Sequence, residues 1–398
     1  MSINYKTIDD YDLSDKTVLI RSDLNVPVND EGEVEDDFRI KKSIPTIKHV
    51  LDEGGTAVLM SHLGRPEGKE VEHLKMDSVA GRLQEHLSHN VTKLDDCVGV
   101  EVEESVENAE ERSVFLLENL RFHPEEKENL DEFAKQLAFL GDVYVNDAFG
   151  TCHRRHASIV GVPNYIQQSG AGKLLEDEIE HLLALLESPD SPFTLLLGGA
   201  KVTDKVGMVQ SLLPNLDQVL VGGAMSYPFL RAKGHTAGDF ELDAETINAA
   251  DEILDAAESA GVTIDLPVDH LVTDSLDEGS GVLRISEGEI QPGWNGGDIG
   301  PESIRTFNEK LSESGTVFWN GPMGIFEQEN FSRGSELIAR HLAEQNDITR
   351  VTGGGDTAAV LSKYDLDESY DHVSTGGGAL IQFLQKGSLP GLEALPNA

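Results

Sequence analysis

The sequence predicts an α/β protein with two domains, each a parallel β-sheet flanked by helices. Short aliphatic or β-branched runs alternate along the chain with longer segments of helical spacing, which is typical of parallel sheets. Each run ends in Gly, His, Arg, Asn or Asp rather than in a hairpin dipeptide. At 398 residues, the chain also exceeds what one core usually organises. These observations favour two Rossmann-like domains, whose polar motifs follow the carboxyl ends of the strands.

The expected elements follow one another in both halves of the chain. The predicted strands are 56–60, 113–117, 142–145, 195–197, 218–221, 316–319 and 350–352. The clearest predicted helices are 131–140 and 245–254, where apolar residues recur every three or four positions. A further amphipathic stretch, 174–186, ends before a Pro-containing segment and is the expected connector between the domains.

Charge is the most unusual property of the composition. Lys and Arg total 31 against 72 Asp and Glu, which gives a formal net charge of -41. Such a surface repels nucleic acids and anionic membranes, so neither is expected as a partner. Acidic runs such as Asp95-Asp96 and Glu125-Glu126 are interpreted as solvated helix faces or loops. Because salt screens this self-repulsion, we expect the protein to work in a salt-rich cytoplasm.

Two further observations bear on location and redox chemistry. No long uncharged apolar run occurs, and the N-terminus lacks the pattern of a signal peptide, so a cytoplasmic protein is expected. Cys97 and Cys152 are too few for a disulfide framework or a four-thiolate metal site. Cys152 lies beside His153 and near His156, which could indicate a zinc site or a thiol nucleophile. That spacing matches no zinc signature, so a small side chain in a tight loop is the preferred interpretation.

Basic residues gather after strands in the first half of this acidic chain. They are Arg21, Arg39, His62, Arg65, Arg121 and Arg154. If the strands share one sheet, these cations meet at its carboxyl edge and form a basic pocket. Guanidinium groups hold phosphate and carboxylate with paired hydrogen bonds, so a small, multiply charged anion is the expected ligand. The alternative for any single arginine is an ion pair with a local acid.

The second half carries glycine turns after its strands, and two of them are expected to open helices. The turns are Gly198-Gly199, Gly222-Gly223, Asn320-Gly321, Gly353-Gly354-Gly355 and Gly376-Gly377-Gly378. Helix amino termini with bare amides bind phosphate. Lys201 and Lys205 are expected on the first turns of a helix, projecting from one face. Asp356 could hold magnesium against phosphate oxygens, or cap a helix.

Known nucleotide fingerprints are absent from these turns. No Gly-x-x-x-x-Gly-Lys-Ser/Thr loop occurs, and no Gly-x-Gly-x-x-Gly pattern follows a strand. A dinucleotide-dependent dehydrogenase and a nucleotide-dependent ligase on a similar scaffold are therefore disfavoured.

Nine motifs of the chain together resemble the phosphoglycerate kinase family, in family order and over the full length. They begin at Arg21-Ser-Asp23, Asp37-Phe-Arg39, Ser61-His62, Glu118-Asn119, Asp147-Ala148, Gly198-Gly199, Trp319-Asn320, Gly353-Gly354 and Ser374-Thr375. The chain departs from the family pattern at Ser226 and Pro228, near the position of the nucleotide base.

The resemblance implies reversible phosphoryl transfer between 1,3-bisphosphoglycerate and ADP, giving 3-phosphoglycerate and ATP. The implied phosphoglycerate contacts are Asp23, Asn25, Arg39, His62, Arg65, Arg121 and Arg154. The implied contacts of the Mg²⁺-nucleotide are Lys201, Lys205, Asn320, Glu327, Gly354, Gly355, Asp356 and Thr357, with Glu327 on the ribose and Asp356 on the metal. The groups expected to stabilise the transferring phosphoryl are Arg39, Lys205 and the amides near Gly355 and Gly378.

The same resemblance suggests how the domains are divided and move. Residues 1–172 would bind phosphoglycerate, 173–187 would form an interdomain helix, 188–372 would bind nucleotide, and 373–398 would form a hinge segment and a tail returning to the first domain. Substrates on separate domains require a cleft that closes by hinge motion to exclude water. A monomer is expected. The alternative function is a catalytically idle scaffold that binds phosphorylated metabolites.

Overall fold

The computed structural model describes residues 5–277 and 281–398, and it divides the chain into two compact units. The first unit comprises Met1–Glu180 and Ser388–Ala398, and the second comprises His181–Gly387. The boundary falls inside helix α6 (Lys173–Glu187). The first four residues of the predicted N-terminal domain lie outside the described part of the chain.

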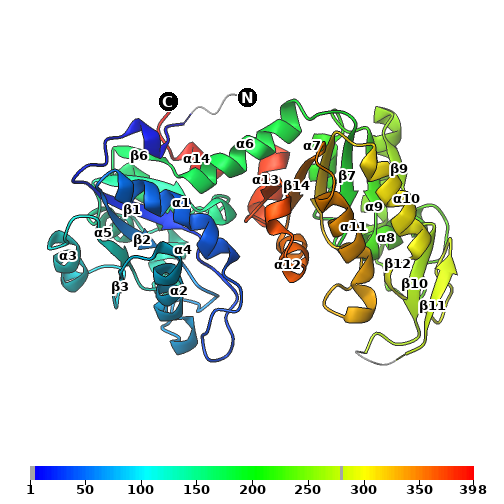
Figure 1. The fold of residues 1–398 in the computed structure, drawn as a ribbon, viewed down its shortest axis with the longest axis horizontal. Helices are drawn as coiled ribbons and strands as arrows, with labels where there is room; N and C mark the ends of the chain where they lie inside the picture. The colour runs from blue at the N-terminus through cyan, green and yellow to red at the C-terminus, as the bar shows by residue number, and fades with distance from the viewer. Residues whose placement is uncertain (1–4, 278–280) are drawn as a thin grey trace. The chain divides into compact units, whose positions relative to one another are not determined.

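The first unit is built on a six-stranded parallel sheet in the order β3-β4-β2-β1-β5-β6. Its strands are β1 (Thr17–Ser22), β2 (Thr56–Met60), β3 (Val91–Lys93), β4 (Val114–Leu116), β5 (Val143–Asp147) and β6 (Gln168–Ala171). Its helices, visible in Figure 1, are α1 (Phe38–Asp52), α2 (Asp77–Leu87), α3 (Val100–Glu107), α4 (Pro124–Glu128), α5 (Asp131–Ala138) and α14 (Pro390–Glu393).

Both faces of this sheet are buried, as the continuous apolar runs require. On one face, Val18 and Ile20 of β1 join a core cluster with Ile40 of α1 and Leu83 of α2. Leu19 points to the opposite face, because side chains alternate along a strand, and it is also fully buried. Helices therefore cover the faces, and the polar groups at the strand ends remain for binding.

The second unit repeats this architecture with a sheet in the order β15-β14-β13-β7-β8-β9, also parallel. Its strands are β7 (Phe193–Leu197), β8 (Gln218–Val221), β9 (Thr263–Asp265), β13 (Thr316–Asn320), β14 (Thr349–Gly353) and β15 (His372–Val373). Its helices are α7 (Val206–Leu212), α8 (Ser226–Ala232), α9 (Ala244–Ala260), α10 (Pro301–Ser312), α11 (Arg333–Ala343), α12 (Gly355–Lys363) and α13 (Gly378–Lys386). The two parallel sheets confirm the predicted fold class.

The second unit also contains an antiparallel sheet that the sequence analysis did not anticipate. Its order is β11-β10-β12, formed by β10 (Asp269–Thr273), β11 (Leu283–Glu287) and β12 (Asn295–Ile299). The strands are short and rich in charged or glycine residues, so they lack the apolar runs that revealed the parallel strands. Among the helices of the described residues, none is both long and apolar enough to cross a bilayer.

The segment Ser388–Ala398 packs on the first unit although it follows the second in sequence. The Gly391 amide donates to the Cys152 carbonyl (2.8 Å), and the Lys6 amide donates to the Pro396 carbonyl (2.9 Å). A Cβ on Gly391 would lie 3.0 Å from the Cys152 sulfur and from the Asn146 side chain. This close approach leaves little room for a larger residue, and Asn146 of β5 also donates to the Gly391 carbonyl at 3.5 Å.

Candidate active site

Polar side chains of the first unit meet where β1 and β2 end and α1 begins. Asp23 follows β1, and its buried carboxylate accepts a hydrogen bond from Arg39 Nη1 at 2.6 Å. Arg39 is the second residue of α1, which places its guanidinium at the amino end of that helix. His62 follows β2, and its Nδ1 lies 4.0 Å from the other oxygen of Asp23. The structure thus brings together three of the predicted phosphoglycerate contacts.

A second group of contacts is organised around the peptide of Gly64. Its amide donates to Asn25 Oδ1 (2.8 Å), and its carbonyl accepts from Arg121 Nη1 (2.8 Å). Gly64 has a φ of +61°, and an added Cβ would contact Leu74 at 2.7 Å. Asn25 and Arg121 are therefore held at the same loop, next to Arg65.

Arg21 differs from the expectation that it lines the basic pocket. It is fully buried, and its guanidinium already contacts Ser158 Oγ (2.9 Å), His62 Nδ1 (3.1 Å) and the Ser22 carbonyl. Its hydrogen bond orients the His62 ring instead of leaving a free cation for a ligand.

Glu126 was interpreted as part of a solvated acidic run, and this is wrong. Its side chain is fully buried and accepts from the Ser158 amide (2.9 Å) and hydroxyl (2.6 Å). Ser158 in turn receives Arg21 Nε, so Glu126 provides a counter-charge beneath the basic cluster. Burial raises the pKa of Glu126, and Arg21 opposes that shift. A charge pattern alone could not reveal it, because in the sequence Glu126 simply stands between two other charged residues, Glu125 and Lys127.

Histidines near this cluster are held in the neutral form. Burial, and then the neighbouring Arg21, lower the pKa of His62 well below its usual value and that of His156 to about 4. Burial, and then Arg154, lower the pKa of His153 to about 4. Burial and Arg21 also lower the pKa of Arg121 to about 10, so it remains charged at neutral pH. The cluster is thus a region of positive potential that favours an anion.

Several buried polar atoms at this edge have no partner among the described residues. They are Ser22 Oγ, Asp23 Oδ1 and Arg121 Nε. Buried polar atoms without partners are rare in native proteins, and at a sheet's carboxyl edge they are consistent with a ligand site. Arg65 and Arg154 are exposed beside them. The neighbouring Arg155 lies 3.8 Å from Glu393, whereas no ion pair of Arg154 is found within the described ranges.

The second unit brings its polar groups together where β13 and β14 end. Lys205 donates to the Asn320 side-chain oxygen, and Asn320 Nδ2 donates to the Gly353 carbonyl at 2.6 Å. Thr357 Oγ1 accepts from the Gly321 amide at 2.7 Å and donates to the Gly353 carbonyl at 3.1 Å. Burial lowers the pKa of Lys205, while Asp204 and Asp356 oppose the shift. Lys205, Asn320, Thr357 and Asp356 therefore form one cluster.

The prediction that Lys201 and Lys205 lie on the first turns of a helix is wrong. Helix α7 begins only at Val206, with Lys205 at its N-cap and Lys201 in the preceding loop. Lys205 is half-buried, whereas Lys201 is exposed. Five residues of loop separate β7 from the turn before α7, and among them Gly199 takes a φ of +83°, which suits glycine.

Glycines do open two helices, as predicted. Helix α12 starts at Gly355 after Gly354, whose φ of +101° suits glycine, and α13 starts at Gly378 after Gly377. A Cβ on Gly355 or Gly377 would meet open space, so the backbone there is accessible to a ligand. The N-cap interpretation of Asp356 is wrong, because Gly354 occupies that position without a side-chain bond.

Two other predicted residues have different surroundings. Glu327 is exposed in the loop after β13 and makes no hydrogen bond to the cluster within the described residues. Cys152 is buried in a tight turn at the end of a 3₁₀ segment, and Asn146 Nδ2 approaches its sulfur at 3.4 Å. This agrees with the small-side-chain interpretation and not with a zinc site at Cys152.

Comparison with known proteins decides the family. The family model described as phosphoglycerate kinase matches residues 8–387. The chain belongs to the phosphoglycerate kinase family. Members of this family are phosphotransferases whose acceptor is a carboxyl group, and the chain is therefore an enzyme of this class.

Individual phosphoglycerate kinases are similar to this chain over nearly its whole length. A phosphoglycerate kinase of Pelotomaculum thermopropionicum is 47% identical over 390 residues, covering 98% of each chain. The solved structure of phosphoglycerate kinase from Coxiella burnetii matches with a TM-score of 0.83 at 34% identity, covering 98% of each chain. That of phosphoglycerate kinase from Pyrococcus horikoshii OT3 matches with a TM-score of 0.86 at 32% identity, with the same coverage.

Proposed function

We propose that this chain transfers a phosphoryl group reversibly between 1,3-bisphosphoglycerate and ADP, giving 3-phosphoglycerate and ATP. The observation that carries the proposal is the full-length family match, supported by the two preformed polar clusters. The idle-scaffold alternative is not favoured, because the charged groups expected of both half-sites are present.

The first unit would bind the phosphoglycerate through side chains. The proposed contacts are Asp23, Asn25, Arg39, His62, Arg65, Arg121 and Arg154. The positive cluster and its unpartnered polar atoms support this assignment, because a small anion would satisfy both the charge and the hydrogen bonds. Neutral His62 would donate a hydrogen bond without adding a further charge.

The second unit would bind the nucleotide chiefly through backbone amides and ammonium groups. The proposed contacts are Lys201, Lys205, Asn320, Glu327, Gly354, Gly355, Asp356 and Thr357. Accessible glycines at the start of α12 and α13 support phosphate binding at these helix termini.

Magnesium would be held by Asp356. Its exposed carboxylate is the second residue of α12 and caps no helix, so a hard oxygen donor is available beside the proposed phosphate site. When bound, the ion would neutralise charge on the nucleotide phosphates.

Catalysis by these residues would consist of alignment and charge neutralisation. The acceptor is a carboxylate that is already ionised at neutral pH, so no general base is needed. Arg39, Lys205 and the amides near Gly355 and Gly378 would stabilise the transferring phosphoryl group. Because the two ligands would bind to different units, we propose that hinge motion brings them together and excludes water.

A coupled assay of ATP-dependent phosphorylation of 3-phosphoglycerate tests the function directly. The proposal expects turnover that requires both substrates and Mg²⁺. Binding of both ligands to well-folded protein without turnover would instead support the scaffold.

The acidic composition supports a proposal about the working environment. We expect a monomer in a salt-rich cytoplasm, with thermal stability rising from dilute buffer to molar KCl because salt screens the net charge of -41. Melting temperatures measured against KCl concentration check this, and maximal stability in dilute buffer would contradict it.

A further inference from the structure

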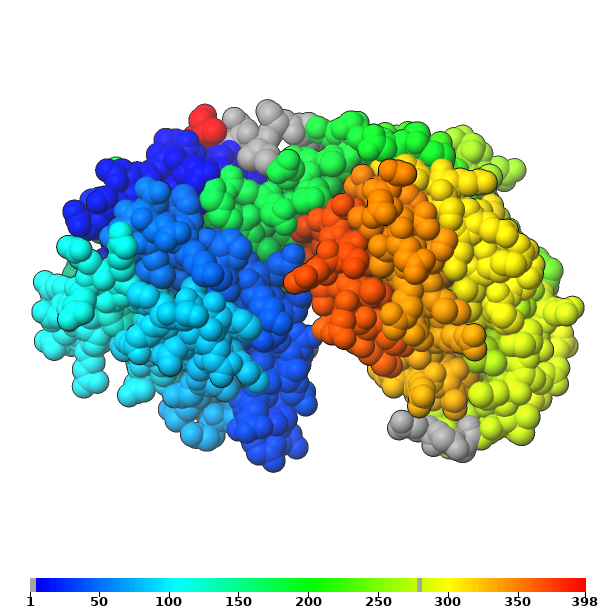
Figure 2. All heavy atoms as spheres, in the orientation of Figure 1, coloured from blue at the N-terminus to red at the C-terminus, as the bar shows by residue number. Residues whose placement is uncertain are grey.

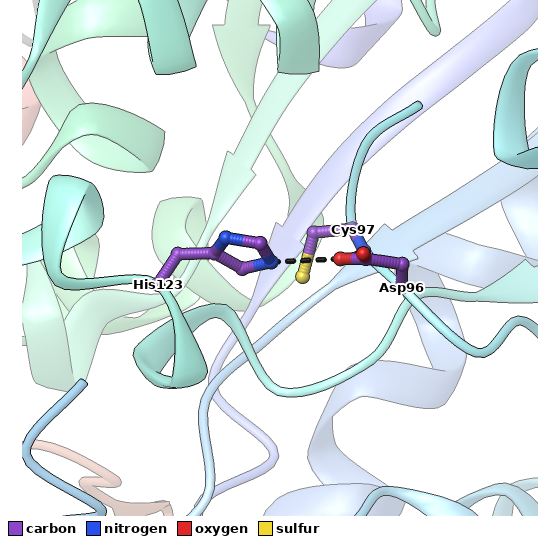
Figure 3. Close-up of side chains that lie close together, drawn as sticks. All are labelled: Asp96, Cys97 and His123. Carbon is purple, nitrogen blue, oxygen red and sulfur yellow. Dashed lines mark hydrogen bonds and ion pairs between the residues drawn. The ribbon is translucent and has the colours of Figure 1, made fainter. Parts of the chain in front are cut away.

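Three side chains that zinc prefers as ligands converge in the first unit, and none of them is among the residues assigned to either substrate. They are Asp96, Cys97 and His123, and their candidate ligand atoms all lie within 4.8 Å of one another. Figure 3 shows the side chains pointing toward one another, with the Cys97 sulfur beside the line that joins the His123 ring to Asp96. We propose that this cluster binds Zn²⁺ through the Cys97 thiolate, the His123 imidazole and the Asp96 carboxylate, with water completing the tetrahedron.

The ligands come from two separate loops. Asp96 and Cys97 follow β3 and precede α3, whereas His123 lies between the 3₁₀ turn Leu120–Phe122 and α4. The loops already touch, because His123 Nε2 lies 2.7 Å from Asp96 Oδ1. The Cys97 thiol donates to the carbonyl of Glu118, which precedes that 3₁₀ turn, at 2.9 Å. A metal ion would replace a weak thiol contact with bonds that join the two loops.

The geometry fits metal coordination better than nucleophilic catalysis. His123 Nε2 lies 2.7 Å from Asp96 Oδ1, on the side of the ring where the sulfur also lies. In a thiol–imidazole–carboxylate relay the thiol and the carboxylate use opposite ring nitrogens. Here both approach the same side, as ligands around one ion do.

The surroundings hold the ligands in place and leave a path for the ion. The His123 ring stacks on Phe133 with centroids 5.0 Å apart, and the Cys97 amide donates to Asp96 Oδ1 at 2.6 Å. Cys97 is fully buried, but the side chains of His123 and Asp96 are 27% and 54% exposed. The segment around residue 100, cyan in Figure 2, reaches the molecular surface on the face shown. Asp96 also lines a cavity of about 460 Å³ together with Gly99 and Val100, so its carboxylate is reached from solvent on that side.

Binding requires a defined proton balance. The Cys97 thiol releases its proton to solvent. The proton that His123 Nε2 donates to Asp96 must also leave that nitrogen, so that the neutral ring carries its proton on Nδ1 and Nε2 becomes the ligand. Burial raises the pKa of the Cys97 thiol well above its usual value, so the free thiolate is not formed without a cation beside it.

The experiment must separate this site from weak cation binding by the acidic surface. Chelator-treated, full-length protein is titrated with Co²⁺, whose charge-transfer absorption appears only when a thiolate is bound, and Zn²⁺ is then added as competitor. The expected result is saturation at one equivalent and loss of the band with one equivalent of Zn²⁺. The chain offers a matched control, since Cys152 is the only other cysteine and is equally buried.

Four variants decide the outcome. Cys97→Ser is expected to abolish the band, His123→Ala and Asp96→Asn to weaken Co²⁺ binding at least tenfold, and Cys152→Ser to leave it unchanged. Zn²⁺ should also raise the melting temperature of the wild type and of Cys152→Ser but not of Cys97→Ser. Circular dichroism checks that each variant is folded. If Cys97→Ser does not fold, Asp96→Asn still tests the site, because Asp96 is half-exposed and its replacement disturbs the core less. No thiolate band in the wild type, or a band lost in Cys152→Ser alone, would overturn the proposal.

Discussion

The two units share a parallel-sheet architecture, but their candidate half-sites consist of different chemical groups. The first unit uses charged side chains, several of them buried, such as Asp23 at 3% exposure and His62 at 2%. The second unit combines glycines at the starts of helices, where an added Cβ would meet open space, with Lys205 as its half-buried cation. A side-chain site is specific and already desolvated, whereas a backbone site tolerates changes that keep the amide.

This contrast predicts different responses to substitution. In the first unit, removal of one side chain removes the contact and leaves partners such as Asp23 unpaired. In the second, the glycine positions should tolerate any substitution that neither deletes an N–H nor bends the chain. The comparison can be tested at one position in each unit.

The largest effect is expected for Arg39→Ala. It removes a guanidinium proposed to stabilise the transferring phosphoryl, so kcat should fall by about 10²–10³-fold. Nucleotide affinity should stay nearly unchanged, because Arg39 lies in the other unit. Steady-state kinetics with both substrates varied provide the measurement.

Arg39→Lys is the matched control for that variant. It keeps the charge but loses the planar fork, so an intermediate rate is expected. Unaltered turnover in Arg39→Ala would remove this residue from the catalytic assignment.

A smaller loss is expected for Gly355→Pro, which deletes one amide of the second half-site. Gly355 is the first residue of α12, a position where proline is compatible with a helix. Loss of one charge-assisted hydrogen bond, about 1.5–3 kcal/mol, should reduce kcat/KM for ATP by roughly 10–100-fold. Fluorescence-monitored nucleotide binding and kinetics check this.

Ala244→Pro supplies the control, because Ala244 is the exposed first residue of α9 and is not among the assigned contacts. It tests the effect of an N1 proline alone and should leave ATP kinetics unchanged. Equal losses in both variants would indicate a general helix effect and would refute a specific role for the Gly355 amide.

The smallest effects concern pH and have opposite signs in the two units. His156 of the first unit has its pKa lowered to about 4 by burial and Arg21. The unfolded chain therefore binds more protons between pH 6.5 and about 4, and stability falls as the pH falls through that window. His156→Gln should lose less stability than the wild type between pH 7 and 5, as measured by urea unfolding.

Asp298 of the second unit should behave in the opposite way. Burial raises its pKa to about 7, against hydrogen bonds from the Gly334 and Ile299 amides. The folded state then binds more protons than the unfolded state between about pH 4 and 7. The contribution of protonated Asp298 to the stability of the fold is therefore lost as the pH rises. Asp298→Asn should flatten that part of the stability profile. Profiles that both variants shift in the same direction would contradict the assignment.

Sequence reasoning identified most of the fold because the parallel strands are continuous apolar runs. Strands 56–60 and 218–221 match β2 and β8 residue for residue. β5 runs on through Asn146 and Asp147, which were expected to lie beyond it, because strand hydrogen bonding does not depend on side-chain polarity. The antiparallel strands escaped detection because Leu283 and Ile285 of β11 are exposed and carry no core pattern.

Within the candidate sites, sequence reasoning found charges but not their environment. Arg21 and Arg121 looked alike in sequence, yet only the structure shows Arg21 occupied by Ser158 and His62. Glu126 looked like a surface acid, because its partners lie more than thirty positions away at Ser158. The cluster of Cys97 and His123 was missed for the same reason, since its loops are distant in sequence and adjacent only in the folded sheet.

The packing of Ser388–Ala398 onto the first unit has a consequence for biosynthesis. A ribosome releases the strands of the first unit early, but the segment that carries Gly391 emerges only after the whole second unit has been translated. The first unit therefore lacks its contacts beside β5 until the second unit has been translated. We expect the nascent first unit to be the part of this chain that most needs protection from aggregation.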